Sequence, residues 1–214
     1  CRAPDRATEL GALRGAYPEL RVLPLDVEDE GAIEAAAETV RGETDRLHLL
    51  MNVAGILHDG ALGPEKKLDE IRPDHLHRVF AINAFGPLLV AKHFAPLLRH
   101  DAPAVLANLS ARVGSIGDDR LGGWYAYRAS KAAQNMFTKN LSIELGRRAK
   151  QLAVIALHPG TVDTGLSAPF TGRVPKDKLF STERAARQLL AICDGARPED
   201  TGRFFAWDGQ EIPW

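Results

Sequence analysis

The stretch Leu152–Gly160, LAVIALHPG, decides the fold class. Its six successive apolar residues predict a strand buried on both faces, which is typical of a parallel sheet covered by helices. The last three residues, HPG, favour a turn at the end of that strand. Similar buried strands are expected at Leu47–Val53 and Ala104–Leu109. We therefore expect a parallel sheet whose strands end in short turns.

Helical segments separate these strands along the chain. Helices are expected at Asp5–Ala16, Glu28–Val40, Asp74–Leu98, Trp124–Arg147 and Thr182–Cys193, with further strands at Arg21–Asp26 and Arg203–Trp207. Pro24 cannot donate to a ladder, so its strand should lie at a sheet edge. Asp5 is expected to cap the first helix. The alternation predicts an α/β fold, a three-layer doubly wound parallel sheet in one domain, with ligands bound at the carboxyl ends of the strands.

Composition narrows the classes of partner. The 214 residues carry 27 basic and 28 acidic side chains, a net charge of −1, so no global field favours nucleic acid or an anionic membrane. No wholly apolar run reaches the roughly 20 residues of a membrane span. The two cysteines suit a reducing compartment, and the histidines form no convincing ligand set. We expect a cytoplasmic protein with no nucleic-acid, membrane or metal partner.

Tyr127 and Lys131 form the first candidate catalytic pair. Positions i and i+4 share one face of a helix, so the phenol and the ammonium can converge. A free phenol has a pKa of about 10, and a nearby cation favours the phenolate and lowers that value. Such a pair can exchange a proton with a carbonyl or alcohol oxygen. The same spacing also arises by chance, so the pair needs support from other residues.

Asn83 and Pro87 supply some of that support. Proline has no N–H group, so the carbonyl of Asn83, four residues earlier, loses its partner within the helix and a kink is expected. A carbonyl freed in this way can hold a water of a proton relay. A kink that serves packing alone would leave the same pattern.

Short turns with small or hydroxylated residues follow the strands. Ser110 comes directly after one strand and Ser115 lies five residues on; either hydroxyl could bind a reacting oxygen or cap loop backbone. The small residues Ala54, Gly55 and Gly160 let a flat ligand approach the backbone. Each turn, taken alone, also fits a plain strand-to-helix connection.

Together these segments resemble the classical short-chain dehydrogenase/reductase family, in its C-factor-like and sniffer-like carbonyl reductase branch. The resemblance rests on Leu25-Asp26-Val27, Asn52-Val53-Ala54-Gly55, Asn83-Ala84-Phe85-Gly86, Asn108-Leu109-Ser110, Tyr127-Arg128-Ala129-Ser130-Lys131 and His158-Pro159-Gly160-Thr161-Val162-Asp163-Thr164. Their order and spacing match over essentially the whole chain. The resemblance implies a Rossmann-like fold and hydride transfer between a nicotinamide cofactor and a carbonyl or alcohol.

The resemblance also implies roles for the matching residues. Tyr127 would be the catalytic acid and base, Lys131 would lower its pKa and hold the nicotinamide ribose, and Asn83 would anchor a relay water. Ser110 would bind the reacting oxygen. NADP(H), in preference to NAD(H), would be held by Arg2, Asp26, Val27, Asn52, Ala54, Gly55, Tyr127, Lys131, Pro159, Gly160, Thr161, Val162 and Thr164. Arg2 lies where a basic side chain would favour the 2′-phosphate of NADP.

The chain departs from the family pattern at three places. Val53 replaces the second asparagine of the usual Asn-Asn-Ala-Gly, and Ala111 occupies the place of the usual catalytic serine, which leaves Ser110 or Ser115 to supply the hydroxyl. No Thr-Gly-xxx-Gly-x-Gly turn occurs in the sequence. Residue 1 corresponds to the end of the family's second strand. We therefore expect an N-terminally incomplete domain without the first strand, the glycine turn and the first helix.

The expected function is NADP(H)-dependent reduction of a small-molecule carbonyl compound, or the reverse oxidation of an alcohol. The alternative is a non-catalytic C-factor-like protein that keeps the fold for binding or signalling. Ala111 and the missing glycine turn favour the alternative, whereas the intact Tyr-Lys-Asn set favours the enzyme.

Two further expectations concern the surroundings of the site. Glycine and proline punctuate Asp163–Ser181, which is expected to be a mobile lid over the substrate. Trp124, Tyr125 and Phe170 are expected to form an aromatic rim for a bulky or apolar substrate, although core packing explains them equally well. The two long helices would form the face of a homodimer or homotetramer by family resemblance.

Overall fold

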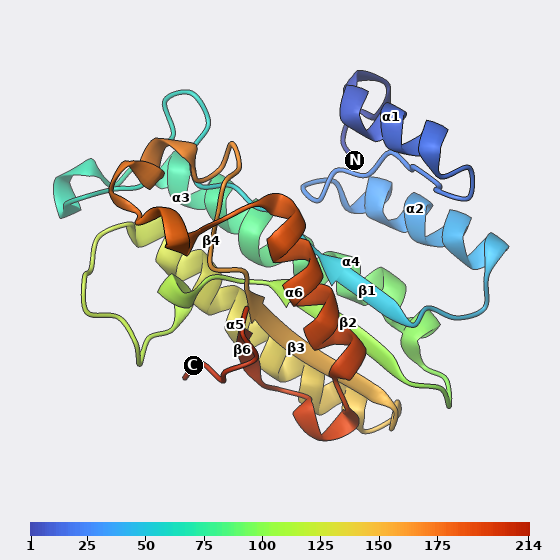
Figure 1. Ribbon diagram of the computed structural model, residues 1–214. Helices are drawn as coiled ribbons and strands as arrows, with labels where there is room; N and C mark the ends of the chain where they lie inside the picture. Colours follow the sequence, from blue (N-terminus) through green and yellow to red (C-terminus); the bar gives the residue numbers. More distant parts are fainter.

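The computed structural model describes the backbone of residues 1–214 and every side chain except that of Arg173. A parallel four-stranded sheet forms its centre (Figure 1). The strands follow the order β1 (Leu49–Asn52), β2 (Ala104–Leu109), β3 (Leu152–His158) and β6 (Phe204–Ala206). The α/β class with a parallel, Rossmann-like sheet is confirmed.

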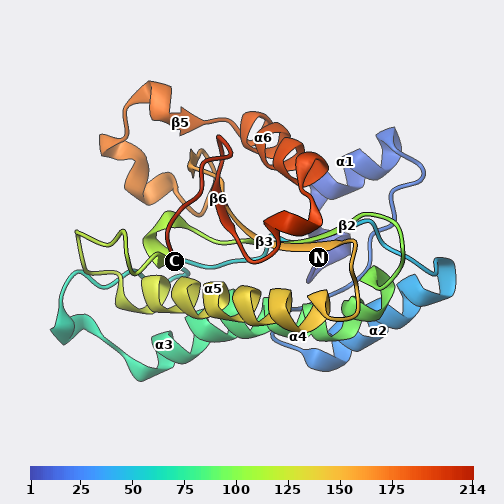
Figure 2. The ribbon, with the colours of Figure 1, turned by 90° about the horizontal axis from the view of Figure 1, so that it is seen from below.

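Helices cover both faces of the sheet (Figure 2). On one face lie α3 (Pro73–Phe80), α4 (Gly86–Phe94) and α5 (Tyr125–Gly146), with α2 (Glu30–Glu43) packed beside α4. On the other face lies α6 (Thr182–Gly195). A two-stranded ladder of β4 (Thr161–Val162) and β5 (Leu179–Phe180) stands beyond the end of β3. All five predicted helices are present.

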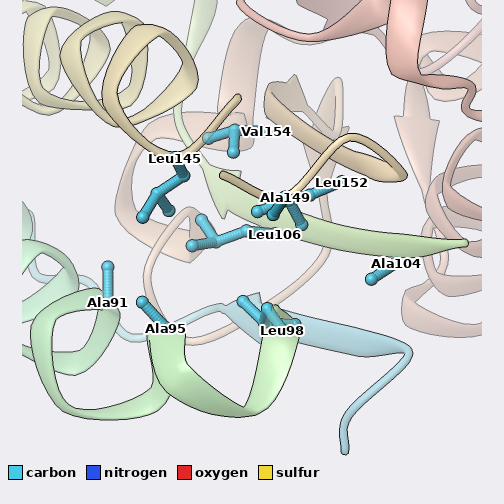
Figure 3. Packing of buried hydrophobic residues seen from close by; sticks show 9 residues of the cluster. All are labelled: Ala91, Ala95, Leu98, Ala104, Leu106, Leu145, Ala149, Leu152 and Val154. Atoms are coloured by element: carbon cyan, nitrogen blue, oxygen red, sulfur yellow. The ribbon is translucent and has the colours of Figure 1, made fainter. Parts of the chain in front are cut away.

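Alternate residues of the buried strands point to opposite layers. Leu106 and Val154 pack against residues of α4 and α5, and Figure 3 shows this cluster from close by. Their neighbours Val105 and Ile155 pack against α6 instead. Because both faces are covered, both sets of side chains must be apolar, which explains the unbroken apolar run of β3.

The helix predicted over 74–98 is one helical stretch from Pro73 to Leu98 with an interruption. A π-helical turn, Ala81–Phe85, separates α3 from α4, and the N–H of Gly86 bonds to the carbonyl of Ala81. The wide turn lies where the missing N–H of Pro87 breaks the regular ladder. By length and composition the whole stretch could cross a membrane, but 61% of its most apolar window is buried inside the protein, as in a core helix.

Two predictions near the start of the chain are wrong. Arg21–Asp26 forms no strand; its only ladder-like contacts join the backbone of Cys1 to Leu23 and Leu25, at 3.1 Å each. A strand needs a partner along its length, and the described residues supply only this one, although Leu23 and Leu25 still pack inward against α2 and α4. Asp5 does not cap α1 (Thr8–Ala16): it lies in a separate 3₁₀ turn.

Candidate active site

Two adjoining cavities open at the carboxyl ends of the strands. They share Gly55, Leu57 and Leu166. The smaller, of about 540 Å³, is lined by four predicted cofactor residues besides Gly55, namely Arg2, Asp26, Val27 and Ala54. The larger, of about 740 Å³, is lined by Ser110, Tyr127, Lys131, Pro159, Gly160, Thr161, Val162 and Thr164. The structure therefore brings together most of the residues that the sequence singled out.

Helix α5 carries the candidate proton-transfer pair. Its Tyr127 and Lys131 lie one turn apart, with the Lys131 Nζ 6.0 Å from the centroid of the Tyr127 ring. The Nζ donates to the carbonyl of Leu109 at 2.8 Å and to Gln134 Oε1 at 3.0 Å. The ammonium is thus held by two neutral oxygens, and no carboxylate among the described side chains pairs with it.

Burial dominates the electrostatics of this pair. It raises the pKa of Tyr127 to about 12 and lowers the pKa of Lys131 to about 7. The lowered phenol pKa expected from the sequence is therefore not found, because loss of solvation on burial favours the neutral phenol. A phenol with a raised pKa stays protonated, which is the form that can give a proton to a carbonyl oxygen.

Asn83 is fully buried and ties two parts of the site together. Its side-chain Oδ1 accepts the N–H of Ile56 at 2.7 Å, and its Nδ2 donates to the carbonyl of Ile56 at 2.9 Å and to Ser130 Oγ at 3.1 Å. A Cβ added to Gly55 would lie 3.4 Å from Asn83 Oδ1 and 3.8 Å from the Nζ of Lys131. The amide and the ammonium therefore border the same small space.

The two candidate serines separate clearly. Ser110 lines the larger cavity and donates to Asn135 Oδ1 at 2.6 Å, which leaves its lone pairs to accept. Ser115 donates to the carbonyl of Pro213 at 2.5 Å and does not line that cavity. Ala111 borders the cavity without a hydroxyl. Of the two serines, only Ser110 is placed where a substrate oxygen could reach it.

Asn52 was expected beside the cofactor and lies elsewhere. It lines neither cavity; its Nδ2 donates to Asn108 Oδ1 at 2.7 Å and to the carbonyl of Pro87 at 3.3 Å. Asn108 in turn donates to Thr138 Oγ1 at 2.9 Å. These bonds join strands β1 and β2 to helices α4 and α5, so Asn52 supports the packing of the sheet and lines neither cavity.

A buried polar row on α5 escaped the sequence analysis. Gln134, Asn135 and Thr138 are all almost fully buried against the strand ends. They lie three, four and seven residues after Lys131, which places them on one helix face. The face of a helix that only packs on a sheet should be apolar. The polar residues on this face were therefore the sequence signal that could have indicated a polar site there.

The rim and His158 complete the larger cavity. Trp124 and Phe170 line it, whereas Tyr125 is exposed and lies outside its lining. His158 ends β3 and lines the cavity, and burial lowers its pKa to about 4, so it stays neutral. The described side chains hold no group of three or more His, Cys, Asp or Glu that could bind a metal ion.

Comparisons with known proteins agree with this geometry. The family model for short chain dehydrogenases matches residues 2–173. The C-signal protein of Myxococcus xanthus is 36% identical over 171 residues, which are 80% of this chain and 95% of that protein. A 1-hydroxy-2-glutathionyl-2-methyl-3-butene dehydrogenase of Rhodococcus sp. (strain AD45) is 34% identical over 89% of this chain and 78% of its own length.

Solved structures give the same result. An NADPH-bound carbonyl reductase from chicken fatty liver superposes with a TM-score of 0.88 at 30% identity, over 100% of this chain and 82% of that one. The carbonyl reductase Sniffer of D. melanogaster superposes with a TM-score of 0.87 at 26% identity, over 100% of this chain and 86% of that one. The chain belongs to the short-chain dehydrogenase family and is an oxidoreductase of its carbonyl reductase and C-factor-like branch.

Proposed function

We propose that this oxidoreductase is an NADP(H)-dependent carbonyl reductase, which also runs in reverse as an alcohol dehydrogenase. Its catalytic set would be Tyr127, Lys131 and Asn83. The observation that carries the proposal is that Tyr127 and Lys131 both line one apolar cavity, while the buried Asn83 lies behind Gly55, another residue of that lining.

The residues present fit a nicotinamide dinucleotide. The two cavities adjoin at Gly55, where the absence of a Cβ keeps open the space beside Lys131 Nζ. The smaller cavity ends at Arg2, a cation suited to a 2′-phosphate, and Val27 there offers an apolar surface for an adenine ring. Lys131 offers its ammonium for ribose hydroxyls at the other end. The chicken liver protein of the same fold was solved with NADPH, which supports the preference for NADP(H) over NAD(H).

The chain's own residues would manage the proton. When bound, NADPH supplies the hydride that reaches the carbonyl carbon. The protonated phenol of Tyr127 then gives its proton to the carbonyl oxygen, so that the C=O bond becomes an alcohol with balanced charge. Lys131 stabilises the phenolate that remains, and Asn83 keeps the relay space open beside it. Reversal of these steps oxidises an alcohol.

The substrate side of the larger cavity is apolar. The rings of Trp124 and Phe170 lie there with centroids 5.1 Å apart, and Ser110 is one of the hydroxyl-bearing residues that line the cavity. Such walls suit a small molecule with an apolar group next to its carbonyl. The segment Asp163–Ser181 contributes Phe170 and would act as the lid; His58 Nε2 contacts the carbonyl of Gly165 at 3.0 Å and would hold it closed.

Assembly and location follow the same reasoning. Phe85, Met136 and Ile143 are exposed apolar side chains on the π-helical turn and on α5. Covering them would remove apolar surface from water, which favours a homodimer or homotetramer through these helices. A cytoplasmic location is proposed because two free cysteines suit a reducing compartment.

The alternative, a non-catalytic protein for binding or signalling, is favoured by Ala111 and by the 36% identity to C-signal. One experiment separates the two. Wild type and Tyr127→Phe are incubated with NADPH and a panel of aldehydes and ketones, and loss of NADPH absorbance is followed. Turnover should fall by at least about 100-fold in the variant, while calorimetric NADPH affinity is retained. Equal turnover, or none in the wild type with NADPH bound, would refute the enzyme.

A further inference from the structure

Glu65 is a buried carboxylate outside the catalytic set. Only 3% of the residue is exposed, although acidic side chains are almost never buried unless paired. It lies in the loop between β1 and α3, and its Oε2 accepts the backbone N–H of Ala126 at 3.1 Å. Ala126 is the residue before Tyr127. The buried carboxyl group of Glu65 therefore fixes the backbone next to the phenol of Tyr127.

The backbone of Glu65 holds the same segment a second time. Its carbonyl accepts the N–H of Trp124 at 2.5 Å. A Cβ added to Gly123 would lie 3.3 Å from that carbonyl oxygen, so the glycine allows the two segments to approach closely. Glu65 thus contacts the start of α5 and the loop before it at three residues, Gly123, Trp124 and Ala126.

Trp124 shows that this contact is demanding. Its φ is +52°, the only positive φ of a non-glycine residue in the described backbone, and it follows Gly122 and Gly123 at +63° and +66°. The left-handed conformation is strained for a tryptophan and persists only where its surroundings hold it. In this conformation its indole lies 6.2 Å from the Tyr127 ring and 5.1 Å from the Phe170 ring. The strain therefore places a wall of the substrate cavity.

Helix α5 has no cap of its own. Trp124 stands at the N-cap position without a side-chain hydrogen bond to the helix, and the first turn contains no acidic residue. Free N–H groups and the helix dipole favour a negative acceptor there. Glu65, 61 residues earlier in the chain, is the residue that supplies it.

We propose that Glu65 is a positioning residue, whose carboxylate and carbonyl set the first turn of α5 and with it the Tyr127 phenol and the Trp124 wall. The inference rests on the proposed carbonyl reduction. Glu65 itself lines neither cavity, so its effect on the reaction passes through Trp124 and the first turn of α5. Because a displacement of about 1 Å at a reacting group can cost about 100-fold in rate, loss of this contact should lower kcat rather than weaken NADPH binding.

The test compares three variants of the whole chain. Glu65→Leu removes the acceptor, and Glu65→Gln keeps an acceptor oxygen at the same distance without the charge. Glu70→Leu is the matched control, because Glu70 Oε2 accepts the N–H of Lys66 at 2.8 Å in the same loop without reaching α5. Measured quantities are kcat, KM for a carbonyl substrate and the NADPH dissociation constant.

We expect Glu65→Leu to lower kcat by roughly 10- to 100-fold with the NADPH dissociation constant within about 3-fold of wild type. Glu65→Gln should recover most of that loss, and Glu70→Leu should match wild type. If the leucine variant does not fold, Glu65→Asp replaces it: one methylene shorter, it keeps the charge but falls short of Ala126. A wild-type kcat in Glu65→Leu, or in Glu65→Asp where that variant replaces it, would overturn the proposal. A loss of kcat in Glu70→Leu as large as that in the Glu65 variant would also overturn it.

Failure of the proposed function would look different. A wild-type protein that reduces no carbonyl and oxidises no alcohol contradicts the enzyme, whatever Glu65 does. Amide hydrogen exchange then still measures the contact: protection of the Ala126 amide, whose N–H Glu65 Oε2 accepts, should be lost in Glu65→Leu and kept in Glu70→Leu. Unchanged protection in Glu65→Leu would refute the claim that Glu65 holds the first turn of α5.

Discussion

Replacing Lys131 by methionine should stabilise the cofactor-free protein at neutral pH. The residue is 4% exposed, and burial lowers the pKa of its ammonium to about 7. In the unfolded chain a lysine has a pKa of about 10.4. Methionine has a similar length and no charge, so the variant keeps the packing of the side chain and loses the buried cation.

The sign and size follow from proton linkage. The folded state holds this proton less tightly, so the unfolded state binds more protons between pH 7 and about pH 10.4, and wild-type stability rises with pH across that window. At about 1.4 kcal/mol per pKa unit, the buried charge costs about 5 kcal/mol below pH 7. The variant also loses the hydrogen bonds of Nζ to Leu109 and Gln134, at about 1 kcal/mol each regardless of pH.

Urea unfolding at pH 7 and pH 9 measures the effect, with Lys150→Met as the control at an exposed lysine. Lys131→Met should be more stable than wild type by about 2–3 kcal/mol at pH 7, and this advantage should shrink by about 2 kcal/mol at pH 9. The control should show no such trend. A gap that stays constant between the two pH values would refute the desolvated ammonium.

Three further predictions concern the surroundings of the site. Pro87→Ala gives the carbonyl of Asn83 a partner within the helix; the π-helical turn should tighten and kcat should fall about tenfold, and an unchanged rate would remove Pro87 from the relay. Gly114→Ala places a Cβ 2.6 Å from the Lys131 Cβ, so urea unfolding should show a loss of about 1–3 kcal/mol together with lower turnover. Arg2→Ala should weaken NADPH binding about 5- to 10-fold and leave NADH unchanged, because only NADPH carries the 2′-phosphate; calorimetry that found equal losses would exclude Arg2 from the cofactor site.

Much of the fold could be predicted from the sequence because its strands are buried on both faces. A run such as LAVIAL has few other uses in a soluble chain, and β3 lies within one residue of the prediction. Arg21–Asp26 failed for the opposite reason. Its apolar residues point inward as expected, but a strand is defined by its partner, and local sequence carries no information on that partner.

The sequence predicts the positions of those site residues that helix periodicity or the end of a strand determines. Tyr127 and Lys131 share a helix face by their spacing, and Pro159–Thr164 follow a strand end into the cavity. The pKa values of Tyr127 and Lys131 could not be predicted, because desolvation depends on all the residues packed around them. The sequence showed a cation near a phenol and implied a lowered phenol pKa, whereas burial raises it.

Helix α5, which carries Tyr127 and Lys131, owes its position to contacts that join distant parts of the chain. Three buried hydrogen bonds connect α5, at successive turns, to two loops and to the π-helical turn. They join Glu65 to Ala126, Asn83 to Ser130, and Ser110 to Asn135. Each tethers a different turn of the helix, so loss of one would tilt α5 about the other two rather than release it. Glu65→Leu, Ser130→Ala and Asn135→Ala each break one tether without changing Asn83 or Ser110. The fall in kcat should be largest for Glu65→Leu, whose tether lies next to Tyr127, and smallest for Asn135→Ala, while the overall fold persists. Alanine or leucine at each position, compared by kcat and by circular dichroism, tests that order; equal effects at all three would show that α5 is held by its packing alone.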